Sequence, residues 1–463
     1  MSEPNNPRDK KLKLPDKNNP REIFGWKMYD WANSGFFTTV VGTLFSPYIT
    51  RLAQDAVGKQ GTVMDLGVLG TVTAESFATL CVSISVGVQV LFLPILGALG
   101  DYSNLKKRLM AAFCYTAVLA TALLFFVSGD LYLLGGVLFI IANVCFGAAI
   151  VFYNAFLPEI TTEDQRDKVS SRGYAYGYFG GGVLLALNLI LVMGAERLGI
   201  SAGLAVRLSF LSAALWWGGF AILTFRRLKK REAARRLPPG QNYFRAGFAE
   251  LRSTFSELRR LPLTLKYLIV YLIYNDGIQT VIFASSVFLE QELFKGPNPT
   301  FLLSIFLVVQ FVAVIGALLF ERLAYIIKTK NAILVSLGLW SAVVIYGYGF
   351  LHNTTQAWIM AIVIAIVLGG SQALSRSLFS RMIPPGREAS FFGMYEISER
   401  GTSWLGPLVF SIVVARTGSY RQALLSLVFF FVVGLIGLVF TNTDRAVHEA
   451  GNLEPWEAAR DPL

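Results

Sequence analysis

The residues best suited to chemistry lie inside an apolar segment, where a charged group is costly. Asp276 falls within the apolar run of about residues 263–289, which is long enough to cross a bilayer. Lys266 marks the start of this run, and the intervening residues at about 1.5 Å each place Asp276 near the middle of a ~30 Å hydrocarbon core. A carboxylate at that depth needs water, a partner or a cargo. Asp276 is therefore predicted to bind a substrate or a proton.

Neighbouring polar side chains share a helical face with Asp276. Asn275, Gln279 and Thr280 fall within about a 140° arc that includes it. Polar groups that converge in this way favour a substrate-binding site. The structural alternative is a buried acid that only clips two helices together.

The first apolar span carries a second polar patch. Asp30, Asn33 and Ser34 lie within about a 100° arc that also includes Phe37. With Trp26 as an interface marker, Asp30 is expected about 10 Å to the cytoplasmic side of the midplane. Asp30 is a candidate proton site, a candidate cation site for a substrate ammonium, or one half of a gate salt bridge.

Further polar groups occur in other spans. Gln89, Gln310 and Gln372 could hydrogen-bond a small zwitterion, although adhesion between helices is the more common use of such residues. Arg376 lies in the last turns of the tenth span. It could pair with Asp30, with Glu396 or with a substrate carboxylate, or extend to the cytoplasmic interface.

The composition indicates a protein that crosses the membrane many times. The chain has 463 residues, of which 54% are hydrophobic and 15% charged, whereas soluble domains carry about 25% charged residues. The net charge of +11 reflects membrane topology, so no nucleic-acid partner is expected. The three cysteines lie in apolar runs and there are two histidines, so no disulfide, metal site or cofactor is expected.

The apolar runs predict an all-α protein with twelve transmembrane helices. They lie at about residues 27–52, 76–99, 109–128, 131–153, 173–194, 204–225, 263–289, 300–320, 331–351, 356–379, 401–416 and 421–441. With both termini in the cytoplasm, most of the 41 Lys and Arg residues fall inside. The exceptions are Arg51, Lys59, Arg197, Arg207, Lys295, Arg416 and Arg421. This asymmetry would collapse if a span in the middle were missed.

A long polar connection divides these spans into two bundles of six. The predicted organisation is a disordered cytoplasmic tail (1–20), an N-terminal bundle (21–225), a cytoplasmic linker (226–262), a C-terminal bundle (263–442) and a second cytoplasmic tail (443–463). The linker opens with a basic cluster suited to anionic lipid. It continues with one apolar stripe, formed by Phe244, Phe248, Leu251, Phe255 and Leu258. The stripe predicts a helix in the membrane interface, with a solvated linker helix as the alternative.

Short internal repeats support two pseudo-symmetric halves. Asn33-Ser34-Gly35 in the first span is similar to Asn275-Asp276-Gly277 in the seventh. The segment 97–101 after the second span is similar to 316–321 after the eighth. Similar segments at corresponding places are typical of transporters built from repeated units.

The segment after the second span resembles the loop 2–3 signature of the major facilitator superfamily. It reads Gly97-Ala98-Leu99-Gly100-Asp101, followed by Lys106, Lys107 and Arg108. Its glycines would allow two helices to approach closely, and its acid would cap a facing helix. The resemblance implies a cytoplasmic gate at Gly97, Asp101, Lys107 and Arg108, to which we assign Glu396 as well. A purely topogenic role for the cations is the alternative.

Four further segments narrow the resemblance. They are 26–34, 274–277, 369–377 and 384–396. Together they resemble the vacuolar amino-acid effluxer-like family, which has bacterial members and fungal members linked to autophagy, over residues 21–442. The resemblance implies a secondary transporter, and the fungal members suggest amino-acid export. We expect a multi-pass protein of the bacterial inner membrane, or of the vacuolar membrane in a eukaryote.

These observations predict a transporter that moves a small polar solute by alternating access. A midplane cavity between the halves would hold the cargo against Asp276 and the first-span patch. The sequence leaves open whether a proton on Asp276 moves with the cargo. A lipid or lysolipid transporter on the same fold is the second possibility, and a receptor or scaffold the third. An enzyme is not expected, since no P-loop, nucleophile elbow or His-Glu-x-x-His segment is found. A monomer is expected.

Overall fold

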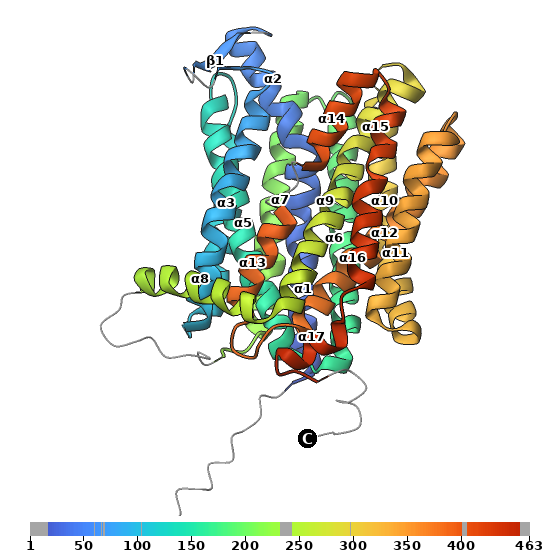
Figure 1. Ribbon diagram of the computed structural model, residues 1–463. Helices are drawn as coiled ribbons and strands as arrows, with labels where there is room; N and C mark the ends of the chain where they lie inside the picture. Colours follow the sequence, from blue (N-terminus) through green and yellow to red (C-terminus); the bar gives the residue numbers. More distant parts are fainter. Residues whose placement is uncertain are drawn as a thin grey trace, which may run out of the picture.

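The computed structural model describes residues 17–59, 61–65, 67, 70–102, 104–231, 243–296, 298–400 and 405–453. Long helices run side by side through its whole height (Figure 1). Ten helices in the described part of the chain are long and apolar enough to cross a bilayer. Of the two other expected spans, the first consists of three consecutive shorter helices, and the described part of the eleventh is the shorter apolar helix Leu405–Thr417. The architecture is therefore the expected all-α membrane protein, and its helices are consistent with twelve spans.

The N-terminal half contains two short strands at one end and otherwise helices. Its elements are α1 (Pro20–Gly35), the π-helical η2 (Phe36–Leu44), α2 (Phe45–Val57), β1 (Thr62–Asp65), β2 (Thr71–Thr73), α3 (Phe77–Tyr102), α4 (Lys106–Leu123), η4 (Leu124–Phe126), α5 (Tyr132–Ile160), η5 (Glu163–Gln165), α6 (Arg166–Met193) and α7 (Ala202–Arg227). The antiparallel strands β1 and β2 lie beside α2, at the end of the bundle away from α8 (Figure 1).

The linker helix and the C-terminal half complete the bundle. Their elements are α8 (Tyr243–Arg260), α9 (Pro262–Phe288), η6 (Leu289–Phe294), α10 (Pro299–Ile327), α11 (Thr329–Gly349), α12 (Thr354–Arg381), α13 (Glu388–Arg400), α14 (Leu405–Thr417), α15 (Tyr420–Ser426), α16 (Val428–Val439) and α17 (Thr443–Glu449). The helix expected in the linker is present as α8, which runs across the end of the bundle (Figure 1).

The buried apolar side chains form two clusters that follow the two halves. One cluster contains residues of the N-terminal half alone, and the other is drawn from α8 and the C-terminal half together with Ala155 of α5. Each half therefore has its own core, as two packed six-helix units require. The halves meet along a narrower set of contacts, which form the candidate site.

Both described chain ends lie at the end of the bundle that carries α8 (Figure 1). Asn19 caps α1 by accepting from the backbone N–H of Arg21 and of Glu22. At the other terminus, α17 follows the last span, and the side-chain amide of Asn452 donates to two carbonyls after α12. Residues 1–16 and 454–463, which make up most of the first predicted tail and about half of the second, lie outside the described residues, as do residues 232–242 of the linker.

One expected absence needs correction. Residues 199–203 match Gly-x-Ser-x-Gly, the pattern of a nucleophile elbow. The Ser201 hydroxyl accepts from the backbone N–H of Leu204 and caps α7. The segment joins two helices, whereas a nucleophile elbow joins a strand to a helix, so this serine is a helix cap.

Candidate functional site: the contact between the halves

A close contact between the halves joins α3 to α13 near the end of the bundle that carries α8. A Cβ atom added to Gly97 would lie 2.2 Å from the carbonyl oxygen of Ala389, and one added to Gly393 would lie 2.8 Å from that of Leu93. Real Cβ atoms do not approach backbone oxygens this closely. The two glycines thus allow the backbones to touch, which is the role expected for Gly97.

Asp101, near the C-terminal end of α3, binds the start of α13. Its carboxylate accepts hydrogen bonds from the backbone N–H groups of Ala389 and Ser390, at 2.9 and 2.8 Å, and from the Ser390 hydroxyl at 2.6 Å. These donors belong to the first turn of α13, so an acid of one half caps a helix of the other. The ammonium of Lys106 lies 3.9 Å from Asp101 and also pairs with Glu159.

Lys107 and Arg108, two of the cations expected at the gate, do not join the halves. Lys107 donates to the carbonyl oxygen of Leu228, within the N-terminal half. Arg108 is exposed. Of the basic residues in this loop, Lys106 is the one beside Asp101, because the helical turn that starts α4 directs its side chain back toward the end of α3.

A second polar contact connects α1, α5 and α6 with α12. The guanidinium of Arg376 lies 3.5 Å from the carboxylate of Asp30, which also accepts from the Tyr153 hydroxyl at 2.6 Å. Arg376 donates further to the hydroxyl and carbonyl oxygens of Ser170, both at 3.0 Å, and to the side chain of Asn154 at 3.3 Å. Only 3% of Arg376 is exposed, so the sequence alternative in which it extends to the interface does not hold.

Asn154 links this contact to α13. Its amide donates to the carboxylate of Glu396 at 2.9 Å while its oxygen accepts from Arg376. Glu396 is fully buried. On the opposite side, Gln372 of α12 accepts from the Tyr178 hydroxyl of α6 at 2.7 Å. Glu396, Arg376 and Gln372 therefore all bind the N-terminal half.

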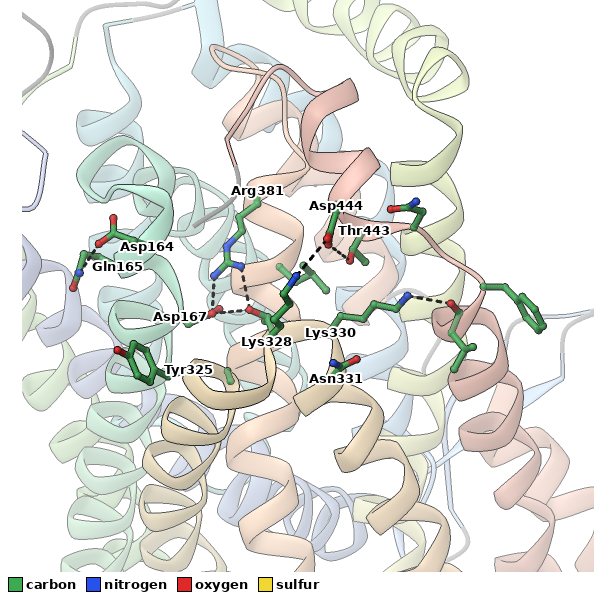
Figure 2. A pocket seen from close by; sticks show the side chains of 16 residues that line it. Asp164, Gln165, Asp167, Tyr325, Lys328, Lys330, Asn331, Arg381, Thr443 and Asp444 are labelled. Carbon is green, nitrogen blue, oxygen red and sulfur yellow. Dashed lines mark hydrogen bonds and ion pairs between the residues drawn. The ribbon is translucent and has the colours of Figure 1, made fainter. Parts of the chain in front are cut away.

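A third contact lies at the C-terminal end of α12, beside a pocket of about 800 Å³ (Figure 2). The guanidinium of Arg381 lies 2.6 Å from the carboxylate of Asp167 at the start of α6. The Thr329 hydroxyl donates to the same carboxylate at 2.6 Å and accepts from Arg381 at 3.0 Å. The pocket is lined by both halves and by residues at the start of α17.

Asp276 lies elsewhere, between α9 and the start of α14. Its Oδ2 atom accepts from the backbone N–H of Gly406 at 2.6 Å, and Oδ1 has no partner among the described residues. The residue is 1% exposed. Both helices belong to the C-terminal half, so the carboxyl caps a helix of its own bundle. Its described hydrogen bond thus lies within one half, and the predicted role of Asp276 in substrate or proton binding stays a prediction.

Two polar neighbours of Asp276 hydrogen-bond to backbone carbonyls, and a third is partly exposed. The amide of Asn275 donates to the Glu399 carbonyl at 3.3 Å, and the Thr280 hydroxyl donates to the Asp276 carbonyl at 2.6 Å. Gln279 is partly exposed. The face predicted from the sequence is therefore present, and it contacts the described end of α13 and the first described turn of α14.

The remaining predicted residues occupy three different environments. Asn33 is buried and Ser34 partly exposed, and Ser34 packs on Gly177 of α6. Gln89 is fully buried against Gly147, and neither polar atom of its amide has a hydrogen-bond partner among the described residues. Gln310 packs on α6. The structure thus brings Asp30, Gln372, Arg376 and Glu396 into one region and leaves Gln89, Gln310 and Asp276 apart from it.

Several residues of this region were not predicted as site residues. Tyr153, Asn154, Ser170 and Lys106 all bind across or beside the contact. The paired Tyr153-Asn154 at the cytoplasmic end of an otherwise apolar span was the available signal. Ser170 carried none, because a serine near a helix start is common.

Comparison with known proteins agrees with this architecture. The family model described as vacuole effluxer Atg22 like matches residues 18–451. The uncharacterized MFS-type transporter YxiO of Bacillus subtilis is 31% identical, over 90% of this chain and 95% of its own. Autophagy-related protein 22-1 of Penicillium rubens is 23% identical, over 93% and 91%.

Solved structures show the same fold at low sequence identity. The major facilitator superfamily transporter FucP in the outward conformation has a TM-score of 0.64 at 14% identity, covering 92% of this chain and 99% of that one. The human organic anion transporter MFSD10 has a TM-score of 0.66 at 15% identity, covering 90% and 99%. The chain accordingly belongs to the Atg22-like vacuole effluxer family, as a transporter of the major facilitator fold.

Proposed function

We propose that this protein moves a small polar solute, such as an amino acid, across a membrane by alternating access, in the direction of export. The observation that carries the proposal is where the halves are joined. Asp101, Asp30 with Arg376, and Asp167 with Arg381 all bind across the seam toward one end. Such polar contacts can exchange with water when the halves rock apart.

The orientation in the membrane belongs to the same proposal. Both described chain ends and α8 lie at one end of the bundle (Figure 1). We call this the closed end, because the cross-half contacts lie toward it. The positive-inside pattern assigns the closed end to the cytoplasm. The protein would then be a monomer of the bacterial inner membrane with both termini inside. The exposed Phe255 and Arg259 of α8 suit an interface rich in anionic lipid.

The experiment combines a distance measurement with a flux measurement. Spin labels are placed at Arg108 and Tyr325, exposed residues of the two halves near the closed end. The distance between the labels, measured in liposomes by double electron–electron resonance, reports opening of that end. Counterflow of radiolabelled amino acids reports transport. We expect two distance populations whose ratio changes with the transported solute. A single distance that no solute changes, together with no counterflow, would contradict alternating access.

Proton coupling through Asp276 has its own test. Asp276→Asn keeps an oxygen that can accept from Gly406 but removes the proton-carrying acid. If Asp276 carries a proton, flux loses its dependence on a pH gradient while the thermal unfolding temperature stays unchanged. Undiminished proton-driven flux would assign Asp276 to helix capping alone. Flux of lysolipid in place of amino acids would favour the lipid-transporter alternative.

A further inference from the structure

The guanidinium of Arg376 sits among aromatic rings that all belong to the other half. Its central carbon lies 4.9 Å from the ring centroid of Trp26, 5.6 Å from that of Tyr153 and 4.2 Å from that of Tyr174. These rings come from α1, α5 and α6, whereas Arg376 belongs to α12. Aromatic faces within about 6 Å of a cation attract it electrostatically.

The same pocket supplies a carboxylate and neutral acceptors. Asp30 lies 3.5 Å from Arg376, and oxygens of Ser170 and Asn154 accept its hydrogen bonds at 3.0 to 3.3 Å. Each of these groups belongs to the N-terminal half. We call Trp26, Asp30, Tyr153 and Tyr174 the cation cage.

The walls of the cation cage hold one another without help from Arg376. The Trp26 indole N–H donates to the Tyr153 carbonyl at 2.9 Å, and the two rings stack at 4.4 Å. The Tyr153 hydroxyl fixes Asp30. A Cβ atom on Gly173 would lie 2.6 Å from the Asp30 carboxylate and 2.8 Å from Trp26. The space for a cation therefore depends on a glycine at 173, and the cage persists as a preformed site when Arg376 leaves.

Opening of the cytoplasmic end would empty this site. Arg376 moves with α12, and Glu396 moves with α13, because both belong to the other half. Asp30 then faces the cytoplasm within an aromatic cage and without its counter-charge. Aromatic rings combined with a carboxylate recognise organic cations.

We propose that the cation cage binds the guanidinium or side-chain ammonium group of a solute taken from the cytoplasm, and that Arg376 is a tethered competitor for it. This inference rests on the alternating access proposed above and assigns a chemical class to its cargo. Closure returns Arg376 to the cage and displaces the cargo cation toward the opposite side. Because the cargo cannot stay in the cage after closure, this displacement would favour release of the cargo on the opposite side over its return to the cytoplasm.

Binding to the purified full-length protein tests the competition. The probes are L-arginine and L-citrulline, which differ in that a neutral ureido group replaces the guanidinium. Arg376→Ala should bind arginine at least about tenfold more tightly than the wild-type protein in calorimetry, because the tethered competitor is removed. Citrulline binding should not gain. Adding Asp30→Asn should abolish the gain.

Arg381→Ala is the matched control, since it breaks another cross-half ion pair at the same end but keeps Arg376 as the competitor, so it reports the gain that opening alone gives. An equal gain in arginine affinity for Arg381→Ala, or an equal gain for citrulline, would overturn the cage. Labels at Arg108 and Tyr325 separate this failure from that of the proposed function. If Arg376→Ala opens at the cytoplasmic end but does not bind arginine, the cation-cage proposal is wrong and alternating access is not affected. If the label distances show no opening of the cytoplasmic end in any variant, both proposals are wrong.

Discussion

At the scale of single residues, Gln89 is the clearest case of a polar group without a structural reason. Its amide is fully buried, and both of its polar atoms lack partners in the described part of the chain. Such a group costs about 1–3 kcal/mol. Gln89→Met should therefore raise the thermal unfolding temperature, and if the amide serves cargo, counterflow should fall at the same time. Gln372→Met, which loses the Tyr178 bond, should lower that temperature. An unchanged or lower temperature for Gln89→Met would show that the amide is satisfied.

The sequence located acids and cations well but not their partners. It allowed Arg376 three partners, and the structure places it beside Asp30. The rings of Tyr153 and Tyr174 could not be foreseen, since they come from separate spans and spacing along a chain does not tell which faces meet. Asp276 was expected at the seam from its depth alone. Its hydrogen-bond partner, the backbone N–H of Gly406, lies far along the chain, and hydropathy does not tell which helices pack together.

At the scale of elements, the contact of α3 with α13 predicts a sharp difference between two glycines of one helix. Gly97→Ala would place a methyl group 2.2 Å from a backbone oxygen of α13, whereas a Cβ on Gly87 would meet nothing within 4 Å. Gly97→Ala should therefore force the helices apart and increase the long-distance population between labels at Arg108 and Tyr325. Gly87→Ala should leave it unchanged. Equal distance distributions for the two variants would mean that α3 and α13 do not hold the cytoplasmic end closed.

The order of elements could be read from hydropathy, but the extent of the eleventh span could not. The apolar window began at residue 401, and it left out the preceding helix α13, which begins at Glu388. This helix carries Glu396 and Ser398 and is polar enough to escape a hydropathy window. It can be polar because it packs on α3 and α5 of the other half instead of lipid. A method that reads transfer into lipid misses a segment whose environment is protein.

At the scale of the whole molecule, the cross-half contacts provide a test of whether the two bundles move as rigid bodies. Asp101 binds the start of α13, and Arg381 binds Asp167 at the start of α6, with no residue in common. Free energies of sites without shared partners add, to within about 0.5 kcal/mol. If one rocking motion breaks both contacts, Asp101→Asn and Arg381→Ala should each shift the equilibrium toward the open cytoplasmic end. The free energy of opening in the double variant should then equal the sum of the two single shifts. The ratio of the two distance populations between labels at Arg108 and Tyr325 gives this free energy for the wild type, the two single variants and the double variant. A double variant that opens no further than the more affected single variant would instead indicate local fraying of α13 or α6, with the halves still joined.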